Sequence, residues 1–174
     1  MARSIGVHGN LNINLLPSVA LHETFGLAST LEAALREGFP PEAIIVEATE
    51  VDLFSDPVQF AAAINQYRRA GIRFAIDDFG AGYSGLGLLA EFQPDMVKLD
   101  MCLVRNIHSH GPRQSIVRAI RQVCLDLGMD LVAEGVETVE EFRWLQGIGI
   151  SLFQGYLFAR PMFEGLPEFV IPDR

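Results

Sequence analysis

The sequence has few cysteines, no long apolar run and no surplus of positive charge, and each of these deficits argues against a class of protein. Only Cys102 and Cys124 occur among its 174 residues, and their spacing suits neither a disulfide framework nor a metal site. A reducing, cytoplasmic location is therefore expected. No stretch approaches the roughly 20 apolar residues of a membrane span, and Asn10, Asn12 and Asn14 interrupt the segment where a signal peptide would lie.

The charge balance is acidic, with a formal net charge of −9. A protein that binds the phosphate backbone of DNA needs a basic patch, and the sequence shows none, so DNA binding is not expected. Carboxylates that converge on one place need cations to neutralise them. The hydrophobic share of 49% is ordinary for a globular chain, and residues 1–174 are expected to form a single domain.

Six short apolar segments alternate with segments of helical periodicity. Each has the length and the β-branched content of a buried strand. They are Leu11–Leu16, Ala43–Glu47, Ile72–Asp78, Met96–Asp100, Asp130–Glu134 and Ile150–Gln154. Such alternation is typical of parallel βαβ units, which build either an open doubly wound sheet or a (β/α) barrel. No glycine-rich phosphate-binding fingerprint follows the first strand, which weakens the doubly wound alternative.

Helix boundaries are marked by local signals between these strands. Gly111 and Pro112 begin one helical segment, and Gly128 follows its last apolar residue. Thr138 and Glu141 have the spacing of a capping box at the start of another helix. The sequence therefore predicts helices that connect consecutive strands.

Polar residues stand at or near the carboxyl end of every predicted strand. In parallel α/β folds these ends meet at one edge, where functional groups gather. One such residue alone is more often a helix cap or a solvated loop acid, so the argument depends on the whole set. The set comprises Asn14, Glu47, Asp77, Asp78, Lys98, Asp100, Glu134 and Gln154. Oxygen ligands of this kind suit Mg²⁺ or Mn²⁺, whereas zinc favours His and Cys.

The adjacent acids Asp77 and Asp78 are the most specific element of the set. One carboxylate can bridge two cations about 4 Å apart while its neighbour binds the second, which is the arrangement used for in-line attack at phosphorus. A glycine-rich run, Gly80-Ala81-Gly82-Tyr83-Ser84-Gly85, follows them and predicts a tight loop over the site. Lys98 would place a fixed positive charge among the acids.

These motifs resemble the signature blocks of the EAL domain family. The similar blocks are Asp77–Ser84, Pro94–Asp100, Ala133–Thr138 and Gln154–Phe158, together with Asn14–Pro17 and Glu47–Glu50. They occur in the order and at the spacing of the family and cover nearly the whole chain. The resemblance implies a TIM-like (β/α) barrel of EAL type that hydrolyses cyclic di-GMP to linear pGpG with two Mg²⁺ or Mn²⁺ ions.

The resemblance also assigns roles to residues. Asn14, Glu47 and Asp77 would bind the first metal, Asp77 would bridge to the second, and Asp78 would complete the second site. Lys98 and Glu134 would orient and activate the attacking water, with Asp78 counted among the catalytic residues. Glu50 would hold the glycine loop, Glu137 and Gln154 would line the site, and Asp100 would support it.

The sequence departs from the family at its beginning. No Glu-Ala-Leu strand, with its metal-binding glutamate and its phosphate-binding arginine, precedes Asn14. The expectation is therefore an N-terminally truncated, incomplete barrel of about six strands, with the first two missing and with weak or no activity. Its open edges, predicted at Asn12–Leu16 and Gln154–Phe158, favour a homodimer or a larger assembly.

Two other interpretations remain open. The chain can be a degenerate EAL module that acts by binding cyclic di-GMP or by protein contact. It can also be an unrelated barrel enzyme that uses one Mg²⁺, although the paired acids and the glycine loop argue against this. A sensory domain elsewhere in the parent protein is expected from the family.

Overall fold

A computed structural model describes residues 9–15, 27–55, 57–82, 85–163, 165 and 167–172. Several predictions lie outside the described residues. They concern the end of the first predicted strand at Leu16, the following Pro17, and Tyr83 and Ser84 of the glycine loop. None of the helices in the described ranges is long and apolar enough to cross a membrane.

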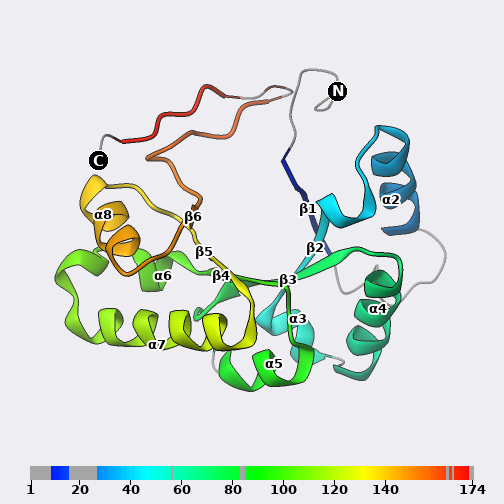
Figure 1. Ribbon diagram of the computed structural model, residues 1–174, viewed down its shortest axis with the longest axis horizontal. Coiled ribbons are helices and arrows are strands. Elements are labelled where there is room, and N and C mark those ends of the chain that lie inside the picture. Colours follow the sequence, from blue (N-terminus) through cyan, green and yellow to red (C-terminus); the bar gives the residue numbers. More distant parts are fainter. Residues whose placement is uncertain are drawn as a thin grey trace. The chain divides into compact units, whose positions relative to one another are not determined.

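Six strands form one sheet, and they neighbour one another in the order in which they occur in the chain, from β1 to β6 (Figure 1). The pairs β1–β2, β2–β3 and β5–β6 are parallel. A doubly wound sheet reverses its strand order at a switch point, whereas the strands of a (β/α) barrel follow in sequence. The consecutive order therefore confirms the barrel type of connection. The strands are β1 (Leu11–Asn14), β2 (Ile44–Thr49), β3 (Arg73–Phe79), β4 (Met96–Leu99), β5 (Asp130–Ala133) and β6 (Leu152–Phe153).

Helices connect the strands, as the alternating pattern predicts. The described helices are α2 (Leu27–Arg36), α3 (Glu50–Ser55), α4 (Pro57–Arg69), α5 (Gly85–Phe92), α6 (Met101–Val104), α7 (Gly111–Leu127) and α8 (Val139–Gly147). Two short 3₁₀ turns, η2 (Pro41–Ala43) and η3 (Ile107–Ser109), precede β2 and α7.

The chain divides into two compact units, and β3 contributes to both. The first unit comprises Met1–Asp77 and Ser84–Met96. Its core lies along β2 and β3, where Val46 and Phe74 are fully buried, with Phe60 and Ile64 of α4 buried as well. Strands covered on both faces read as continuous apolar runs, which explains why both were recognisable in the sequence.

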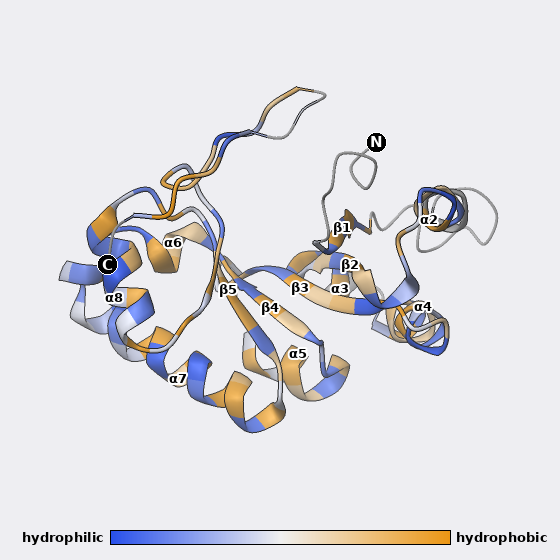
Figure 2. Cartoon of the chain, turned by 45° about the horizontal axis from the view of Figure 1, so that its top comes forward, coloured by the Kyte–Doolittle hydropathy of each residue, from blue (hydrophilic) through white to orange (hydrophobic). Residues whose placement is uncertain are grey.

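The second unit comprises Asp78–Tyr83 and Val97–Arg174. Its helices have the predicted ends: α7 stops at Gly128, which adopts a left-handed φ of 71°, and α8 begins with the capping box of Thr138 and Glu141. Figure 2 shows hydrophobic and hydrophilic residues alternating along α7. Val117, Ile120 and Cys124 are its buried residues, so the apolar side of α7 packs into the core.

Two strand predictions need correction. The predicted edge strand at Gln154–Phe158 is a turn, because Gly155 accepts backbone hydrogen bonds from Phe158 and Ala159. The ring of Phe158 then packs against Phe142 and Phe153. The edge strand is instead the short β6. In the other case, β2 continues to Thr49, so Glu47 lies inside the strand and not at its end.

Candidate metal centre

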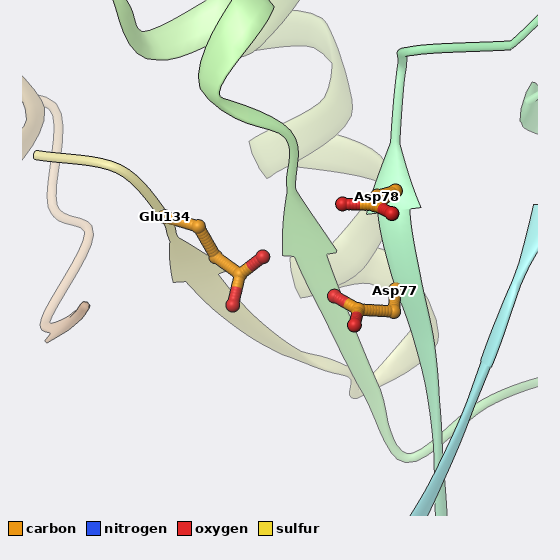
Figure 3. Close-up of side chains that lie close together, drawn as sticks. All are labelled: Asp77, Asp78 and Glu134. Carbon is orange, nitrogen blue, oxygen red and sulfur yellow. The ribbon is translucent and has the colours of Figure 1, made fainter. Parts of the chain in front are cut away.

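Three carboxylates come together at the ends of β3 and β5. One oxygen each from Asp77, Asp78 and Glu134 lies within 4.8 Å of the others (Figure 3). Asp77 and Asp78 are consecutive on β3, and Glu134 directly follows β5 in the same compact unit as Asp78. Such a group of hard oxygen ligands fits Mg²⁺ or Mn²⁺. The structure thus brings together three of the predicted site residues.

Asp78 reaches this cluster through an unusual backbone conformation. Successive side chains of an extended strand point to opposite faces, which would separate Asp77 from Asp78. The φ of Asp78 is +52°, in the left-handed region that Asp tolerates better than most side chains. Figure 3 shows the two carboxylates on the same side of β3. The local departure from extended geometry therefore gives both acids access to one site, and such strain is characteristic of functional positions.

Lys98 forms an ion pair with Glu134. The distance from Lys98 Nζ to Glu134 Oε1 is 2.9 Å, and the two side chains are only 6% and 13% exposed. Lys98 lies on β4 between the fully buried Val97 and Leu99, where an ammonium without a partner would be very costly. The pair therefore places one positive charge beside the carboxylate cluster, as the sequence predicted for Lys98.

Asn14 and Glu47 lie in the first unit, on neighbouring strands and directly opposite each other in the parallel register. Asp77 stands opposite Thr49, two residues beyond Glu47, so its side chain belongs to the same face of the sheet as that of Glu47. The family resemblance assigned Asn14, Glu47 and Asp77 to one metal ion, and this assignment stays a prediction. The sequence analysis missed Asn12, whose Nδ2 donates a hydrogen bond of 2.5 Å to Glu47 Oε1. The alternation of asparagines at positions 12 and 14 was the available signal.

The loop after β3 packs closely on α6. Gly80 has a φ of +98°, and a Cβ at this position would collide with the Leu103 side chain. The Cys102 thiol donates to the Gly80 carbonyl over 3.4 Å. Burial, followed by a hydrogen bond and the charge of Asp100, raises the pKa of Cys102 to about 11. A glycine is therefore required at this point for conformational and steric reasons, as the predicted tight loop implies.

Asp100 and Glu50 each lie at the start of a helix. Asp100 is the N-cap of α6, because its Oδ1 accepts a hydrogen bond of 2.8 Å from the Cys102 backbone N–H. Glu50 begins α3 and is buried. The predicted roles of Asp100 as a supporting residue and of Glu50 as a holder of the glycine loop stay predictions.

Glu137 and Gln154 meet at a pocket in the second unit. The pocket has a volume of about 420 Å³, and its lining includes Met101, Gly135, Glu137, Gln154, Tyr156 and Arg160. The sequence reasoning missed Arg160, whose guanidinium lies 4.4 Å from the centre of the Tyr156 ring. Its place two residues after the Gln154–Phe158 block was the available signal. The pocket contains polar groups of both charges beside an aromatic face.

Arg105 binds Glu137, one of the residues that line this pocket. Its Nη2 donates a hydrogen bond of 2.7 Å to Glu137 Oε1. This bond and the positive charge of Arg105 lower the pKa of Glu137. The same bond and the negative charge of Glu137 raise the pKa of Arg105. This pair could not be predicted from the sequence, because the two residues are 32 positions apart.

Comparison with known proteins places these features in a family. The model of the EAL domain matches residues 1–161. "Blue light- and temperature-regulated antirepressor BluF" of Escherichia coli is 43% identical over 94% of this chain and 41% of its own length. "Cyclic di-GMP phosphodiesterase RocR" of Pseudomonas aeruginosa is 38% identical over 89% of this chain and 39% of its own length. The chain thus spans well under half the length of these relatives.

Solved structures agree in fold. The manganese and cyclic di-GMP complex of Klebsiella pneumoniae BlrP1 superposes with a TM-score of 0.90 and 45% identity, over 97% of this chain and 43% of that chain. The cyclic di-GMP-bound form of a standalone EAL protein from Vibrio cholerae gives a TM-score of 0.88 and 44% identity, over 97% of this chain and 71% of that chain.

Proposed function

Because this chain belongs to the EAL domain family, we propose that its carboxylate cluster serves the metal-dependent hydrolysis of cyclic di-GMP to linear pGpG. The observation that carries the proposal is the convergence of Asp77, Asp78 and Glu134 within 4.8 Å. The described residues hold this cluster in a chain whose relatives are named as cyclic di-GMP phosphodiesterases. A solved relative contains both manganese and the dinucleotide.

The residues fit two divalent cations. Asp77 and Asp78 supply adjacent carboxylates, and Glu47 and Asn14 share the face of the sheet to which Asp77 belongs. We assign Asn14, Glu47 and Asp77 to the first ion and Asp77 with Asp78 to the second. When bound, the two ions would lower the pKa of a water molecule and offset the charge on the phosphate oxygens.

Lys98 and Glu134 would act on the attacking water and the phosphate. Glu134 can accept a proton from the water, and the Lys98 ammonium, held 2.9 Å from it, keeps that carboxylate oriented and balances the negative charge. The water oxygen forms a bond to phosphorus while one ring P–O bond breaks. The water proton ends on the released ribose hydroxyl, and the product is the linear dinucleotide. Glu137 and Gln154 would contact the substrate from the neighbouring pocket.

The direct test is product analysis by liquid chromatography after incubation with cyclic di-GMP and millimolar Mn²⁺. We expect slow formation of pGpG by this chain, which stops when the metal is chelated. Asp77→Asn and Lys98→Met should each abolish it, whereas Asp126→Asn, on the exposed side of α7, should not. If neither this chain nor the longer natural protein forms any pGpG with metal present, the hydrolytic proposal is wrong.

A second candidate function is ligand or protein binding without hydrolysis. It is favoured by the relative that is 43% identical, which is named as an antirepressor and not as a phosphodiesterase. Calorimetry with cyclic di-GMP distinguishes the two functions. Saturable binding in Mn²⁺ with no pGpG formed by the whole protein would support the binding module, and turnover would exclude it.

Three features of the whole protein belong to the same proposal. A sensory domain is expected elsewhere in it, because this chain covers only 41% of a relative described as regulated by blue light and temperature. A cytoplasmic location fits Cys102 and Cys124, both free thiols. A homodimer or larger assembly is expected from the outer strands of the sheet. The proposed single EAL-type domain would comprise residues 1–174.

A further inference from the structure

Glu141 is a buried carboxylate with a set of partners that a helix cap alone does not explain. Its exposed fraction is 0%. Oε2 accepts hydrogen bonds from the backbone N–H groups of Glu137 at 3.0 Å and Thr138 at 3.1 Å. Oε1 accepts a third, of 2.8 Å, from the backbone N–H of Asn106. A buried acid in this environment is stable only because both of its oxygens are satisfied.

The first two bonds are local and belong to the start of α8. The bond from the Thr138 backbone N–H and the bond from the Glu141 backbone N–H to Thr138 Oγ1 make up a capping box that any helix of this kind can use. The bond to Asn106 is different, because it joins positions 35 residues apart. It connects α8 to the turn between α6 and η3, where Asn106 has a left-handed φ of +55°.

The two segments joined in this way both lead from the candidate metal centre. One segment begins at Lys98 on β4 and runs through α6 to Asn106, and the other begins at Glu134 directly after β5 and runs to Thr138. The Lys98–Glu134 ion pair joins the same two segments at the site itself. Further along, the Arg105–Glu137 bond connects them again. Arg105 is in turn held through its carbonyl, which accepts a hydrogen bond of 2.6 Å from Arg113 Nη1.

The backbones of these two segments also lie in close contact. A Cβ at Gly135, the residue after Glu134, would lie 2.6 Å from Met101 Cβ. The Glu134 backbone N–H donates to the Leu99 carbonyl over 3.2 Å. A shift of either segment would therefore be transmitted to Glu134, because short connections within a packed core move together.

We propose that Glu141 is a positioning residue for the candidate metal centre, which fixes the segment after β5 against the segment after β4 and thereby holds the Glu134 carboxylate in place beside Asp77 and Asp78. This inference rests on the proposed metal site. Glu141 touches neither metal nor substrate. Outer residues that hold the groups around a metal site in place typically change metal affinity by about 10-fold to 100-fold when they are removed.

Three substitutions separate this role from helix capping. Glu141→Asp keeps a carboxylate at the start of α8 but shortens it by one methylene, so it should lose Asn106 before it loses the local bonds. Thr138→Ala removes the other half of the capping box and leaves the link to Asn106 intact. Glu140→Gln is the matched control, because it changes one charge on the exposed neighbouring residue of the same helix.

Two measurements on the whole chain decide the question. Titration calorimetry gives the Kd for Mn²⁺ at a temperature where near-ultraviolet circular dichroism shows every variant folded. Hydrogen exchange reports the protection of residues 100–106 without any metal. We expect Glu141→Asp to raise the Kd for Mn²⁺ at least about tenfold and to speed exchange in residues 100–106. Thr138→Ala should lower the melting temperature but leave the Kd for Mn²⁺ and the exchange in residues 100–106 unchanged. Glu140→Gln should leave the melting temperature, the Kd and the exchange unchanged.

The outcomes distinguish this inference from the proposed function. Equal Mn²⁺ affinity in the native chain and Glu141→Asp would overturn the positioning role and leave the metal site standing. If Thr138→Ala lost as much affinity for Mn²⁺ as Glu141→Asp, the role of Glu141 would be explained by helix capping alone. If the native chain bound no Mn²⁺, the proposed metal site would fail. In that case, unchanged hydrogen exchange in residues 100–106 of Glu141→Asp would still overturn the proposal that Glu141 holds this segment through Asn106.

Discussion

At the scale of single residues, the centre depends on carboxylates held close together with one buried cation beside them. Asp77, Asp78 and Glu134 repel one another when ionised, and Lys98 offsets part of that repulsion through its 2.9 Å contact with Glu134. Such an arrangement has a surplus of negative charge. It should therefore gain stability from divalent cations, and it should suffer when Lys98 is removed.

Mn²⁺ or Mg²⁺ is expected to raise the melting temperature of the chain. A ligand that binds only the folded state stabilises by about 2.7 kcal/mol at a concentration of 100 times its Kd. Asp77→Asn should lose most of this gain, because position 77 is proposed to contact both ions. Differential scanning fluorimetry with and without millimolar Mn²⁺ measures it, with Asp126→Asn as an exposed aspartate control. An equal gain in the two variants would contradict the metal assignment.

The Lys98–Glu134 pair is expected to behave as a coupled unit in the absence of metal. Lys98→Met leaves a largely buried carboxylate without its ion-pair partner, which typically costs about 3–5 kcal/mol. The double variant Lys98→Met with Glu134→Gln removes the uncompensated charge and should regain part of this loss. Urea denaturation of the two single variants and the double variant gives the coupling energy. Strict additivity of the two single effects would show that the pair contributes nothing.

At the scale of elements, the segments after β4 and β5 act together through Glu141. Burial by itself raises the pKa of this carboxyl group. The backbone N–H groups of Asn106, Glu137 and Thr138, with the charge of Arg105, outweigh burial, so its pKa lies below the ordinary value. Ionised Glu141 is therefore the form that the folded chain favours.

This direction sets a pH dependence of stability. A carboxyl group with a depressed folded pKa contributes stability above its unfolded value, about 4.3, and loses it as the pH falls through the folded value. We expect the free energy of unfolding to decrease as the pH drops below about 4.3. In Glu141→Gln this decrease should be less steep than in the native chain. Urea denaturation at several acidic pH values measures the slopes. Glu140→Gln should keep the native slope, and parallel slopes in the native chain and Glu141→Gln would contradict the shift.

At the scale of the whole molecule, the described sheet has β1 and β6 at its two ends. The outer edges of these strands have no neighbour in the strand order of the described residues. Unpaired strand edges tend to recruit partners. We therefore expect a dimer or a larger assembly, which light scattering at micromolar concentration can detect. A concentration-independent mass near 19.2 kDa would show that the edges are covered within one chain.

Activity is expected to increase when a Glu-Ala-Leu strand with its arginine is added before Asn14. No Glu-Ala-Leu strand with its arginine precedes Asn14 in this sequence. A chain extended by such a strand gains a carboxylate ligand and a charge-assisted contact to phosphate. It is expected to hydrolyse cyclic di-GMP at least about a hundredfold faster. A chain extended by the same strand with alanine in place of the arginine is the matched control. An inactive extended chain, with Mn²⁺ present, would favour the binding module.

Most of the strands and helices, and the family, could be predicted from the amino-acid sequence alone. Buried parallel strands have nearly continuous apolar sequences, so β2, β3, β4 and β5 could be located from local composition alone. The capping box of Thr138 and Glu141 and the glycine that ends α7 were likewise readable, because each depends on neighbouring residues. The motif order around Asp77, Lys98 and Glu134 was enough to predict the EAL family, which the family comparison confirms.

Which of these residues contact one another depends on the three-dimensional fold. The consecutive strand order, the bond from Asn12 to Glu47 and the link from Glu141 to Asn106 each join segments far apart in the chain. The left-handed φ of Asp78 is equally invisible in a strand pattern. Local periodicity reports which face of an element is buried, whereas pairing between distant segments follows from packing the whole core. The turn at Gln154–Phe158 shows the same limit, because ring packing with Phe142 replaced the expected strand.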